Sequence, residues 1–381
     1  MNLLISAGEA SGDLHGARLL SALRRARPDL TAFGMGGARL EAAGLERVVA
    51  SEELSVVGVS EVLAKLPALV AALSRMRDEA RRRRPDAAVL IDFPDFHGLL
   101  ARRLRRLGVP LVYYVPPQVW AWRRGRARAI AGRARRIITL FPFEAELFRS
   151  LGADAVWSGH PLVDDVREGL AAPSPLPPMT RRRLVLLPGS RDAELARHWP
   201  VMSEAAARLA RRLDLEVVAV RAPHLADSLF PDAAGRGIRV VSEGLHPVLA
   251  SADLAFVASG TATLEAALCG APMVVVYRMS APTWAIARAL VRLPRVSLVN
   301  IVAGAEVVPE LLQDRLTADA LEREGAAILG SPERTAAMRA ALARVAAALG
   351  PPGASERAAQ EILAALGPHR EAAPAGMRAA R

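Results

Sequence analysis

The sequence of 381 residues contains one cysteine and one lysine. Cys269 lies in an apolar run and has no partner for an internal disulfide, which excludes a disulfide-stabilised secreted scaffold and a zinc site built from cysteine clusters. No Asp-x-Asp pair ends a predicted strand, and the seven histidines show no metal-ligand spacing. We therefore expect a protein of a reducing compartment that needs no metal.

Long uncharged runs are absent as well. The segment 55–76 comes nearest to the roughly 20 residues that a spanning helix needs, but three charged residues interrupt it. The first residues, MNLLIS, follow no basic region and lead at once into glycines and carboxylates, so we expect no signal peptide. The expected location is the cytoplasm.

Arginine supplies almost all of the positive charge, because Lys65 is the single lysine and the net charge is +11. Such a charge produces a positive field that suits nucleic acid, anionic lipid or phosphorylated small molecules. Charge alone does not choose among these ligands.

Short apolar runs alternate with amphipathic stretches, a pattern typical of parallel sheets built from βαβ units. Strands are predicted near 2–6, 31–34, 87–92, 111–115, 136–140 and 155–157, and again near 183–188, 215–220, 238–241, 253–256 and 273–276. Helices are predicted near 12–26, 60–84, 96–107, 143–149, 192–211, 245–250, 260–268 and 355–366. The fold class is therefore α/β, with two doubly wound domains.

Four prolines between residues 167 and 181 mark a stiff, extended linker. The predicted domains are 1–166 and 182–345, and the last segment, 346–381, carries a helix that we expect to pack back on the first domain. Ligands of open α/β sheets bind at the carboxyl ends of the strands, so the site is expected in those loops.

The first predicted strand runs into a glycine-rich turn before a helix. The turn contains Gly8, Glu9, Ser11, Gly12 and Asp13. Its glycines allow close backbone approach, and free N–H groups at a helix start attract anionic or hydroxyl-rich ligands, so these residues are candidate acceptor contacts. A tight turn in which Ser11 or Asp13 caps the helix is the alternative. His15 either reaches the same cleft, as a second catalytic candidate, or lies on the surface.

Asp92 ends another apolar strand and is the first candidate for a catalytic base. A carboxylate beside apolar side chains at a strand tip has a raised pKa and is suited to accept a proton. Asp95 is expected to cap the following helix. His97 is either a ligand contact or a satisfied core residue.

Aromatic residues next to an arginine cluster follow the strand near 111–115. Such a segment can stack on single-stranded nucleic acid, seat in a lipid headgroup layer or hold a phosphorylated substrate, and a solvated basic helix with buried tryptophans is the alternative. Gln118 and Trp120 are assigned to the acceptor cleft. The predicted membrane face consists of Val56, Val57, Val59, Leu66, Leu69, Arg123 and Arg124.

Polar residues in the second domain suit a nucleotide diphosphate. Arg191 follows Pro188-Gly189-Ser190, where a guanidinium can grip a diphosphate bidentately, whereas Glu194 simply favours the helix N-terminus. The turn at 258–265 offers hydroxyls and N–H groups for phosphate, and a carboxylate for ribose hydroxyls. The candidate donor contacts are Arg191, Ser259, Gly260, Thr261, Thr263, Glu265 and, as an amide at a strand end, Asn300.

Seven segments taken together resemble the lipid-A-disaccharide synthase family, in order over residues 3–315. They are SAGEASGD from residue 6, DFPDF from 92, VWAWR from 119, SGHPL from 158, LPGSR from 187, SGTATLE from 259 and VPELLQ from 308. The resemblance implies a glycosyltransferase of GT-B type, with two Rossmann-like domains facing across a cleft. In this family's pattern the Asp92 position is needed for activity, and the Arg191 and Asn300 positions serve the donor nucleotide.

The implied reaction transfers 2,3-diacylglucosamine from UDP to 2,3-diacylglucosamine 1-phosphate with inversion, and we expect it to need no metal and no organic cofactor. Partners would be these two lipids and the anionic inner face of the cytoplasmic membrane, which the protein would bind peripherally, and a homodimer is a further expectation. A UDP-sugar 2-epimerase or another transferase on the same fold is the nearest alternative. An RNA-binding protein is the alternative from another class, although we expect no nucleic-acid partner.

Overall fold

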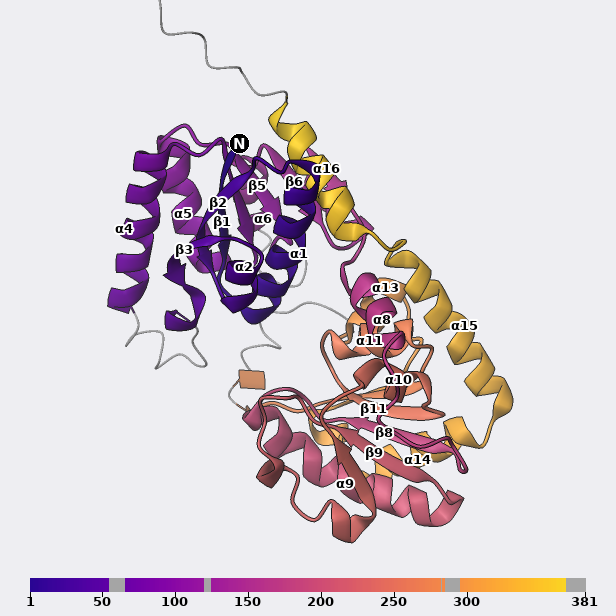
Figure 1. Ribbon diagram of the computed structural model, residues 1–381. Coiled ribbons are helices and arrows are strands. Elements are labelled where there is room, and N and C mark those ends of the chain that lie inside the picture. Colours follow the sequence, from indigo (N-terminus) through magenta and orange to yellow (C-terminus); the bar gives the residue numbers. More distant parts are fainter. Residues whose placement is uncertain (55–65, 120–124, 282, 285–294, 368–381) are drawn as a thin grey trace, which may run out of the picture. The chain divides into compact units, whose positions relative to one another are not determined.

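The computed structural model describes residues 1–54, 66–119, 125–281, 283–284 and 295–367. The chain forms two compact units (Figure 1). The N-terminal unit contains Met1–Pro161 and the segment from Gly353 onward, and the C-terminal unit contains Leu162–Pro352. The chain therefore leaves the first unit once and returns to it at the end.

The N-terminal unit is built on a sheet of seven parallel strands. These are β1 (Asn2–Ala7), β2 (Thr31–Gly36), β3 (Glu46–Ala50), β4 (Ala87–Ile91), β5 (Leu111–Tyr114), β6 (Arg136–Thr139) and β7 (Ala155–Trp157). Their order is β3-β2-β1-β4-β5-β6-β7. β3 was not predicted from the sequence; it is an edge strand whose first two residues, Glu46 and Arg47, are exposed.

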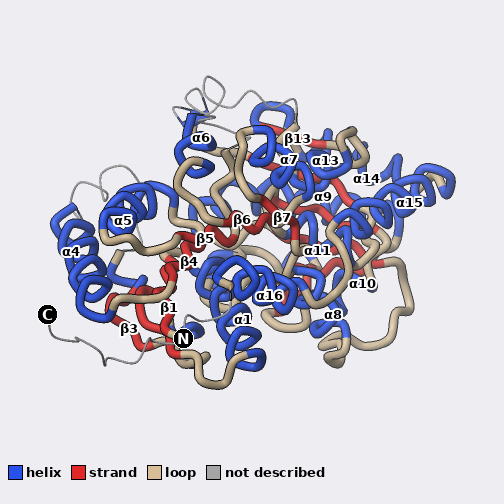
Figure 2. Tube along the Cα trace, turned by 90° about the horizontal axis from the view of Figure 1, so that it is seen from above, coloured by secondary structure: helices blue, strands red, loops and turns tan. Residues whose placement is uncertain are grey.

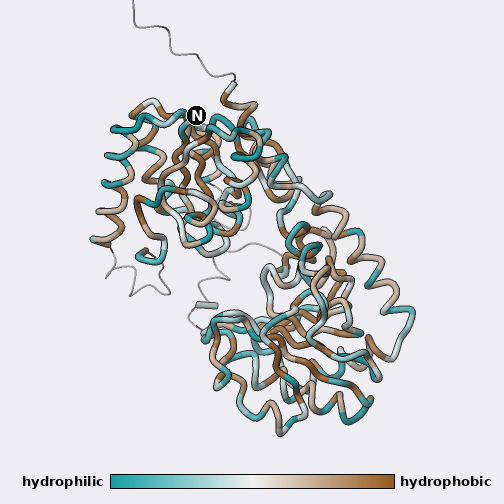
Figure 3. Tube along the Cα trace, viewed as in Figure 1, coloured by the Kyte–Doolittle hydropathy of each residue, from teal (hydrophilic) through white to brown (hydrophobic). Residues whose placement is uncertain are grey.

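Helices cover both faces of this sheet (Figure 2). They are α1 (Ala10–Ala26), α2 (Ala38–Ala42), α4 (Leu66–Arg83), α5 (Pro94–Arg106), α6 (Gly125–Ala131), α7 (Pro142–Ser150) and α16 (Ala354–Leu366). Because side chains alternate along a strand, Leu4 and Leu90 pack against α4 and α5, whereas Leu3 and Val89 pack against α1 and α16. The hydropathy colouring accordingly shows the strands as the apolar centre of each unit (Figure 3).

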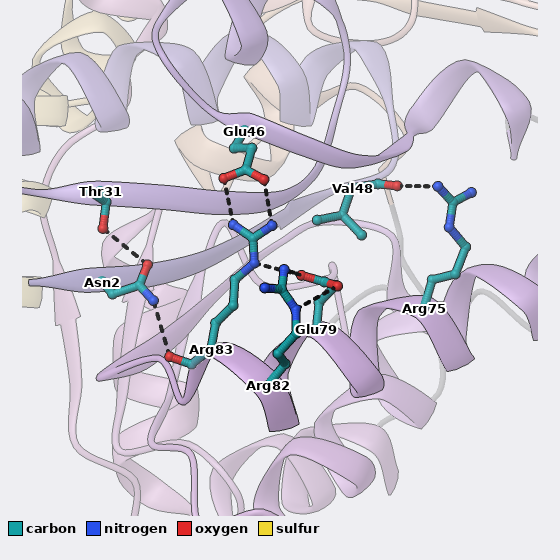
Figure 4. Close-up of polar contacts among 8 residues, drawn as sticks. All are labelled: Asn2, Thr31, Glu46, Val48, Arg75, Glu79, Arg82 and Arg83. Carbon is teal, nitrogen blue, oxygen red and sulfur yellow. Dashed lines mark hydrogen bonds and ion pairs between the residues drawn. The ribbon is translucent and has the colours of Figure 1, made fainter.

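The end of α4 is tied to the sheet by Arg83 (Figure 4). Its guanidinium donates to both carboxylate oxygens of Glu46 on β3 at 2.5 Å and to Glu79 at 2.6 Å. Its carbonyl oxygen accepts from the side chain of Asn2 at 3.4 Å. Exposed pairs contribute little free energy each, but this set connects one helix end to two strands.

The C-terminal unit contains six parallel strands in the order β10-β9-β8-β11-β12-β13. The strands are β8 (Arg183–Leu187), β9 (Glu216–Val220), β10 (Ile238–Val241), β11 (Leu254–Ala258), β12 (Met273–Tyr277) and β13 (Glu310–Leu312). Within each unit the strands follow the order 3-2-1-4-5-6 typical of Rossmann-like domains, with a seventh strand added in the first. In both, the order reverses beside the first strand, between β1 and β4 and between β8 and β11.

Seven helices of the C-terminal unit are described. They are α8 (Leu162–Leu170), α9 (Asp192–Leu213), α10 (Leu245–Ala250), α11 (Ala262–Leu268), α13 (Leu298–Ala303), α14 (Ala318–Leu329) and α15 (Pro332–Ala348). α9 and α14 pack together, and α15 packs on α11 and α13 (Figure 1).

The predicted boundaries at 166 and 345 differ from those in the structure. Leu162–Leu170 is the helix α8, which packs on α10 and α11 and so belongs to the second unit. Residues 167–170 are thus helical rather than part of an extended linker. Gly353 is the first residue of the returning segment, whose helix α16 packs on α1.

Candidate functional site

Asp92 lies directly after β4, at the point where the strand order of the N-terminal unit reverses. Asp92 and Phe93 both have left-handed backbone geometry, with φ of +54° and +53°. Two successive residues of this kind are strained, and such strain persists only where the surroundings fix it. Here His97 bonds the Asp92 carbonyl oxygen through Nδ1 and Ser6 Oγ through Nε2 at 2.8 Å. His97 is therefore a satisfied core residue that supports the turn.

One glycine of the first turn, Gly8, makes room for this strained turn. A Cβ atom on Gly8 would lie 2.2 Å from the ring of Phe93, so only glycine fits beside that ring. A Cβ atom on Gly12 would lie 3.4 Å from the carbonyl oxygen of Ile91. Gly8 is therefore required beside Phe93, whereas a side chain at Gly12 would make only an ordinary contact.

The carboxyl group of Asp92 is half-buried, and its pKa is raised from 3.8 to about 6. Burial is the larger cause, the negative charge of Glu9 is the second, and a hydrogen bond from the Phe93 N–H at 3.0 Å works in the opposite direction. A carboxylate with this pKa is ionised near neutral pH and still basic enough to accept a proton from a hydroxyl group in a transition state.

Glu9, Asp92 and Gln118 line one small cavity of about 190 Å³. The structure therefore brings together three of the residues predicted from separate motifs. Trp120, assigned to the same cleft, lies outside the described residues.

Asp13 has a structural role instead of the predicted one in the acceptor cleft. Its buried carboxylate accepts hydrogen bonds from the backbone N–H groups of Gly37, Arg39 and Leu40 at 2.7, 3.1 and 3.1 Å, and thus caps α2. The alternative, a cap on its own helix, is also wrong because α1 begins at Ala10 and has no side-chain cap. Ser11 lies in the first turn of α1 and is exposed.

The placement of His15 does not support a catalytic role. Its ring lies edge-on to that of His160, at 6.4 Å between centroids, and burial lowers the pKa of His15 to about 4. His15 lines neither of the cavities that hold Asp92, and its Nδ1 has no hydrogen-bond partner among the described residues. It is a neutral, packed side chain.

Asp95 does not cap α5, contrary to the prediction. The N-cap residue is Phe93, without a side-chain hydrogen bond, and Pro94 begins the helix. The carboxylate of Asp95 forms an ion pair with Arg126 instead.

A cavity of about 580 Å³ lies at the carboxyl ends of β8, β9, β10 and β11. Arg191 is the N-cap residue of α9, and its side chain is 69% exposed. It donates to Glu194 at 3.2 Å, and Glu194 also accepts from the Ser190 N–H at 3.1 Å. One carboxylate therefore orders the turn and leaves most of the guanidinium open to the cavity.

The turn after β11 forms the other side of the cavity. Ser259, Gly260 and Thr261 line it, and the Thr261 side chain makes no capping hydrogen bond to α11. Glu265 also lines it and pairs with His246 Nε2 at 3.2 Å. Three further lining residues were not predicted, because single polar side chains after β9 and β10 form no motif. They are Arg221, Ser242 and Glu243.

Two predicted donor contacts face the protein interior. Thr263 is fully buried, and its hydroxyl donates to the Gly260 carbonyl at 2.8 Å. Asn300 is also fully buried and lies in α13 rather than at a strand end. Its amide nitrogen donates to Val308 O and Glu310 Oε1 at 2.8 Å, and its oxygen accepts from the N–H groups of residues 307 and 308. In this conformation neither side chain is available to a nucleotide.

The predicted membrane face is described only in part. Leu66 and Val70 in the first turns of α4 are each 52% exposed, whereas Leu69 is partly buried against the core. Val56, Val57, Val59, Arg123 and Arg124 lie outside the described residues. None of the described helices is long and apolar enough to span a bilayer.

A metal-binding cluster is absent from the described part of the chain, where no three His, Cys, Asp or Glu side chains gather. Cys269 is partly buried, and its Sγ lies 3.6 Å from the His246 carbonyl oxygen. Burial raises the pKa of this thiol to about 12, so it is unreactive near neutral pH.

The fold matches solved GT-B glycosyltransferases and related epimerases. The calicheamicin glycosyltransferase CalG4 superposes with a TM-score of 0.62 at 17% identity and covers 96% of this chain and 98% of its own. The UDP-GlcNAc 2-epimerase from Neisseria meningitidis gives a TM-score of 0.62 at 9% identity, with 96% and 99% covered. The two Rossmann-like units, each with a cavity at its strand ends, thus define a protein of the GT-B fold class.

Sequence comparison identifies the family. A family model described as lipid-A-disaccharide synthetase matches residues 3–364. The lipid-A-disaccharide synthase of Anaeromyxobacter dehalogenans (strain 2CP-C) is 44% identical over 377 residues, with 96% of this chain and 97% of that one covered. The synthase of Myxococcus xanthus (strain DK1622) is 43% identical over 385 residues, with 97% and 98% covered. The chain belongs to the lipid-A-disaccharide synthase family of glycosyltransferases.

Proposed function

We propose that the protein condenses UDP-2,3-diacylglucosamine with 2,3-diacylglucosamine 1-phosphate to give the tetraacyl disaccharide 1-phosphate and UDP. The observation that carries the proposal is the half-buried carboxyl group of Asp92, with its pKa raised to about 6, at the strand end where an acceptor would bind. Family membership supplies the substrate class. A 2-epimerase would also use a base, to remove the hydrogen at C2 of its sugar, but it needs no acceptor, so the products separate the two activities.

The proposed reaction is a single displacement. Asp92 accepts the proton of the acceptor 6-hydroxyl while that oxygen forms a bond to the anomeric carbon of the donor. The bond from this carbon to the UDP oxygen breaks, and its electron pair leaves with UDP. Attack from the face opposite to UDP inverts the anomeric configuration.

The C-terminal cavity is proposed as the UDP site. Arg191 can donate to the diphosphate and so stabilise the charge of the leaving group, as Ser259 and Thr261 can on the opposite side. Glu265, held by His246, can accept from ribose hydroxyls. The reaction in this proposal needs no metal, because arginine supplies the positive charge.

An Asp92→Asn variant tests the proposed base. We expect turnover of UDP-diacylglucosamine with the phosphorylated acceptor to fall by about 10²–10⁴-fold, the usual contribution of a general base. Asp78→Asn, which removes an exposed carboxylate of α4 that lines neither cavity, is the matched control. Near-normal turnover of a folded Asp92→Asn protein would refute the role of Asp92. A UDP-sugar epimerised at C2, distinguished from its isomeric substrate by NMR and formed without a disaccharide, would identify an epimerase instead.

Peripheral binding to the inner face of the cytoplasmic membrane is part of the proposal. The exposed side chains of Leu66 and Val70 support it, because apolar residues at a helix end can enter the headgroup region beside a positively charged surface. Purified protein should bind anionic vesicles and lose binding as salt rises, and a Leu66→Ser/Val70→Ser variant should bind less. A homodimer stays a prediction, which sedimentation equilibrium checks.

A further inference from the structure

A second cavity in the N-terminal unit is also lined by Asp92, and the reaction described above assigns no ligand group to it. Its volume is about 330 Å³. The cavity is lined by residues of α5, by Tyr113 of β5, and by residues of α6 and of the turn that follows it. Its polar lining residues include three arginines and a tyrosine, namely Arg102, Arg126, Arg133 and Tyr113.

Tyr113 is the buried donor of this cavity. Its side chain is 3% exposed, and its hydroxyl has no hydrogen-bond partner among the described residues. Burial raises the pKa of Tyr113 to about 12, with the nearby Arg133 working in the opposite direction, so the hydroxyl keeps its proton at neutral pH. A buried hydroxyl without a partner costs free energy, and an anionic ligand would satisfy it.

The arginines differ in how far they are neutralised. Arg126 forms an ion pair with Asp95. Asp95 also lines the cavity, as a second carboxylate beside Asp92. Arg102 and Arg133 have no carboxylate partner within the described part of the chain. Two unpaired guanidiniums and a phenol are the donors that bind a phosphate group.

We propose that this cavity binds the phosphate monoester of the acceptor, with Tyr113 and Arg133 as its principal donors and Arg102 at its edge. The inference rests on the proposed function and assigns it a subsite. Because Asp92 lines the same cavity, one hexosamine can present its hydroxyl to the base while its phosphate lies among the arginines. A phospholipid headgroup offers the same chemistry, but its diester has one fewer free oxygen and it carries no sugar hydroxyl for Asp92.

Kinetics with two acceptors test the subsite. Diacylglucosamine 1-phosphate and diacylglucosamine with a free 1-hydroxyl are compared in the same mixed micelles, at saturating UDP-diacylglucosamine. For Arg133→Ala we expect the KM of the phosphorylated acceptor to rise tenfold to a hundredfold, and for Tyr113→Phe about fivefold. The KM of the donor and the rate with the free 1-hydroxyl acceptor should change less than twofold. The control is Arg106→Ala. It removes an exposed arginine at the end of α5 that does not line the cavity.

Each other outcome has a distinct meaning. Equal losses with both acceptors, or no loss in either variant, would overturn the phosphate subsite and leave the transferase reaction intact. Weaker binding of the variants to acceptor-free anionic vesicles, with their preference for the phosphorylated acceptor unchanged, would assign the cavity to membrane phosphate and also overturn it. If the unaltered protein forms no disaccharide from either acceptor, the proposed function itself fails.

Discussion

The negative charge of Glu9 should raise the pKa of Asp92, and a Glu9→Gln substitution measures this effect. The pKa of Asp92 is about 6 instead of 3.8, with burial as the larger cause and Glu9 as the second. Removing the Glu9 charge keeps the burial, so we expect the pKa of Asp92 to fall by roughly half a unit, equivalent to about 0.7 kcal/mol. The acid limb of the pH profile should move to lower pH.

The size of the effect follows from the ionised fraction of the base. With a pKa of about 6, roughly 9% of Asp92 is ionised at pH 5, and a fall of half a unit raises this fraction to roughly 24%. The ratio of kcat/KM at pH 5 to that at pH 8 should therefore rise about threefold in Glu9→Gln. This ratio cancels any loss of acceptor contacts that is independent of pH.

The assay is a pH profile of kcat/KM from pH 4.5 to 8.5 with constant ionic strength. Glu146→Gln, which removes an exposed carboxylate on α7, is the matched control and should leave the midpoint unchanged. A Glu9→Gln profile with an unchanged or higher midpoint would refute the coupling. It would show that the group limiting the rate at low pH is not influenced by this charge.

Three further substitutions separate residues that stabilise the fold from residues that bind the donor. Asn300→Ala should lower the free energy of unfolding by about 2–4 kcal/mol, because it removes the side-chain partner of the Val308 carbonyl oxygen and of the N–H groups of residues 307 and 308; urea unfolding measures this change. Thr263→Val should leave the affinity for UDP within twofold, whereas Arg191→Ala should weaken it by about tenfold to a hundredfold in calorimetric titrations. A stable Asn300→Ala protein, or equal effects of the other two, would contradict these assignments.

The sequence was informative where one short segment determines the outcome. Apolar runs predicted most strands within one or two residues, and they placed Asp92 directly after one of these strands, where the structure has it. The missed strands β3 and β13 are edge strands of three to five residues. Their polar residues, such as Glu46 and Glu310, obscure the apolar pattern, so they depend on pairing with a neighbour.

Residues whose role depends on distant partners were predicted less well. Asp13, Thr263 and Asn300 are polar residues in or beside loops, where ligand binding is a reasonable expectation. The structure instead uses their hydrogen-bonding groups internally, and the N–H groups that Asp13 accepts from are 24 to 27 residues away. Spacing within a motif carries no information about such partners. The left-handed backbone of Asp92 and Phe93 was not predicted either, because it depends on support from the side chains of His97 and Ser6.

The return of the chain to its first unit has a consequence for synthesis. Ala358 and Ile362 of α16 are fully buried against the face of the sheet that Leu3 and Val89 occupy. A ribosome has therefore produced the whole second unit before the residues that cover this apolar surface exist. Until then the nascent protein exposes an aggregation-prone apolar surface on this sheet. A chaperone that covers the surface during translation should raise the yield of native enzyme.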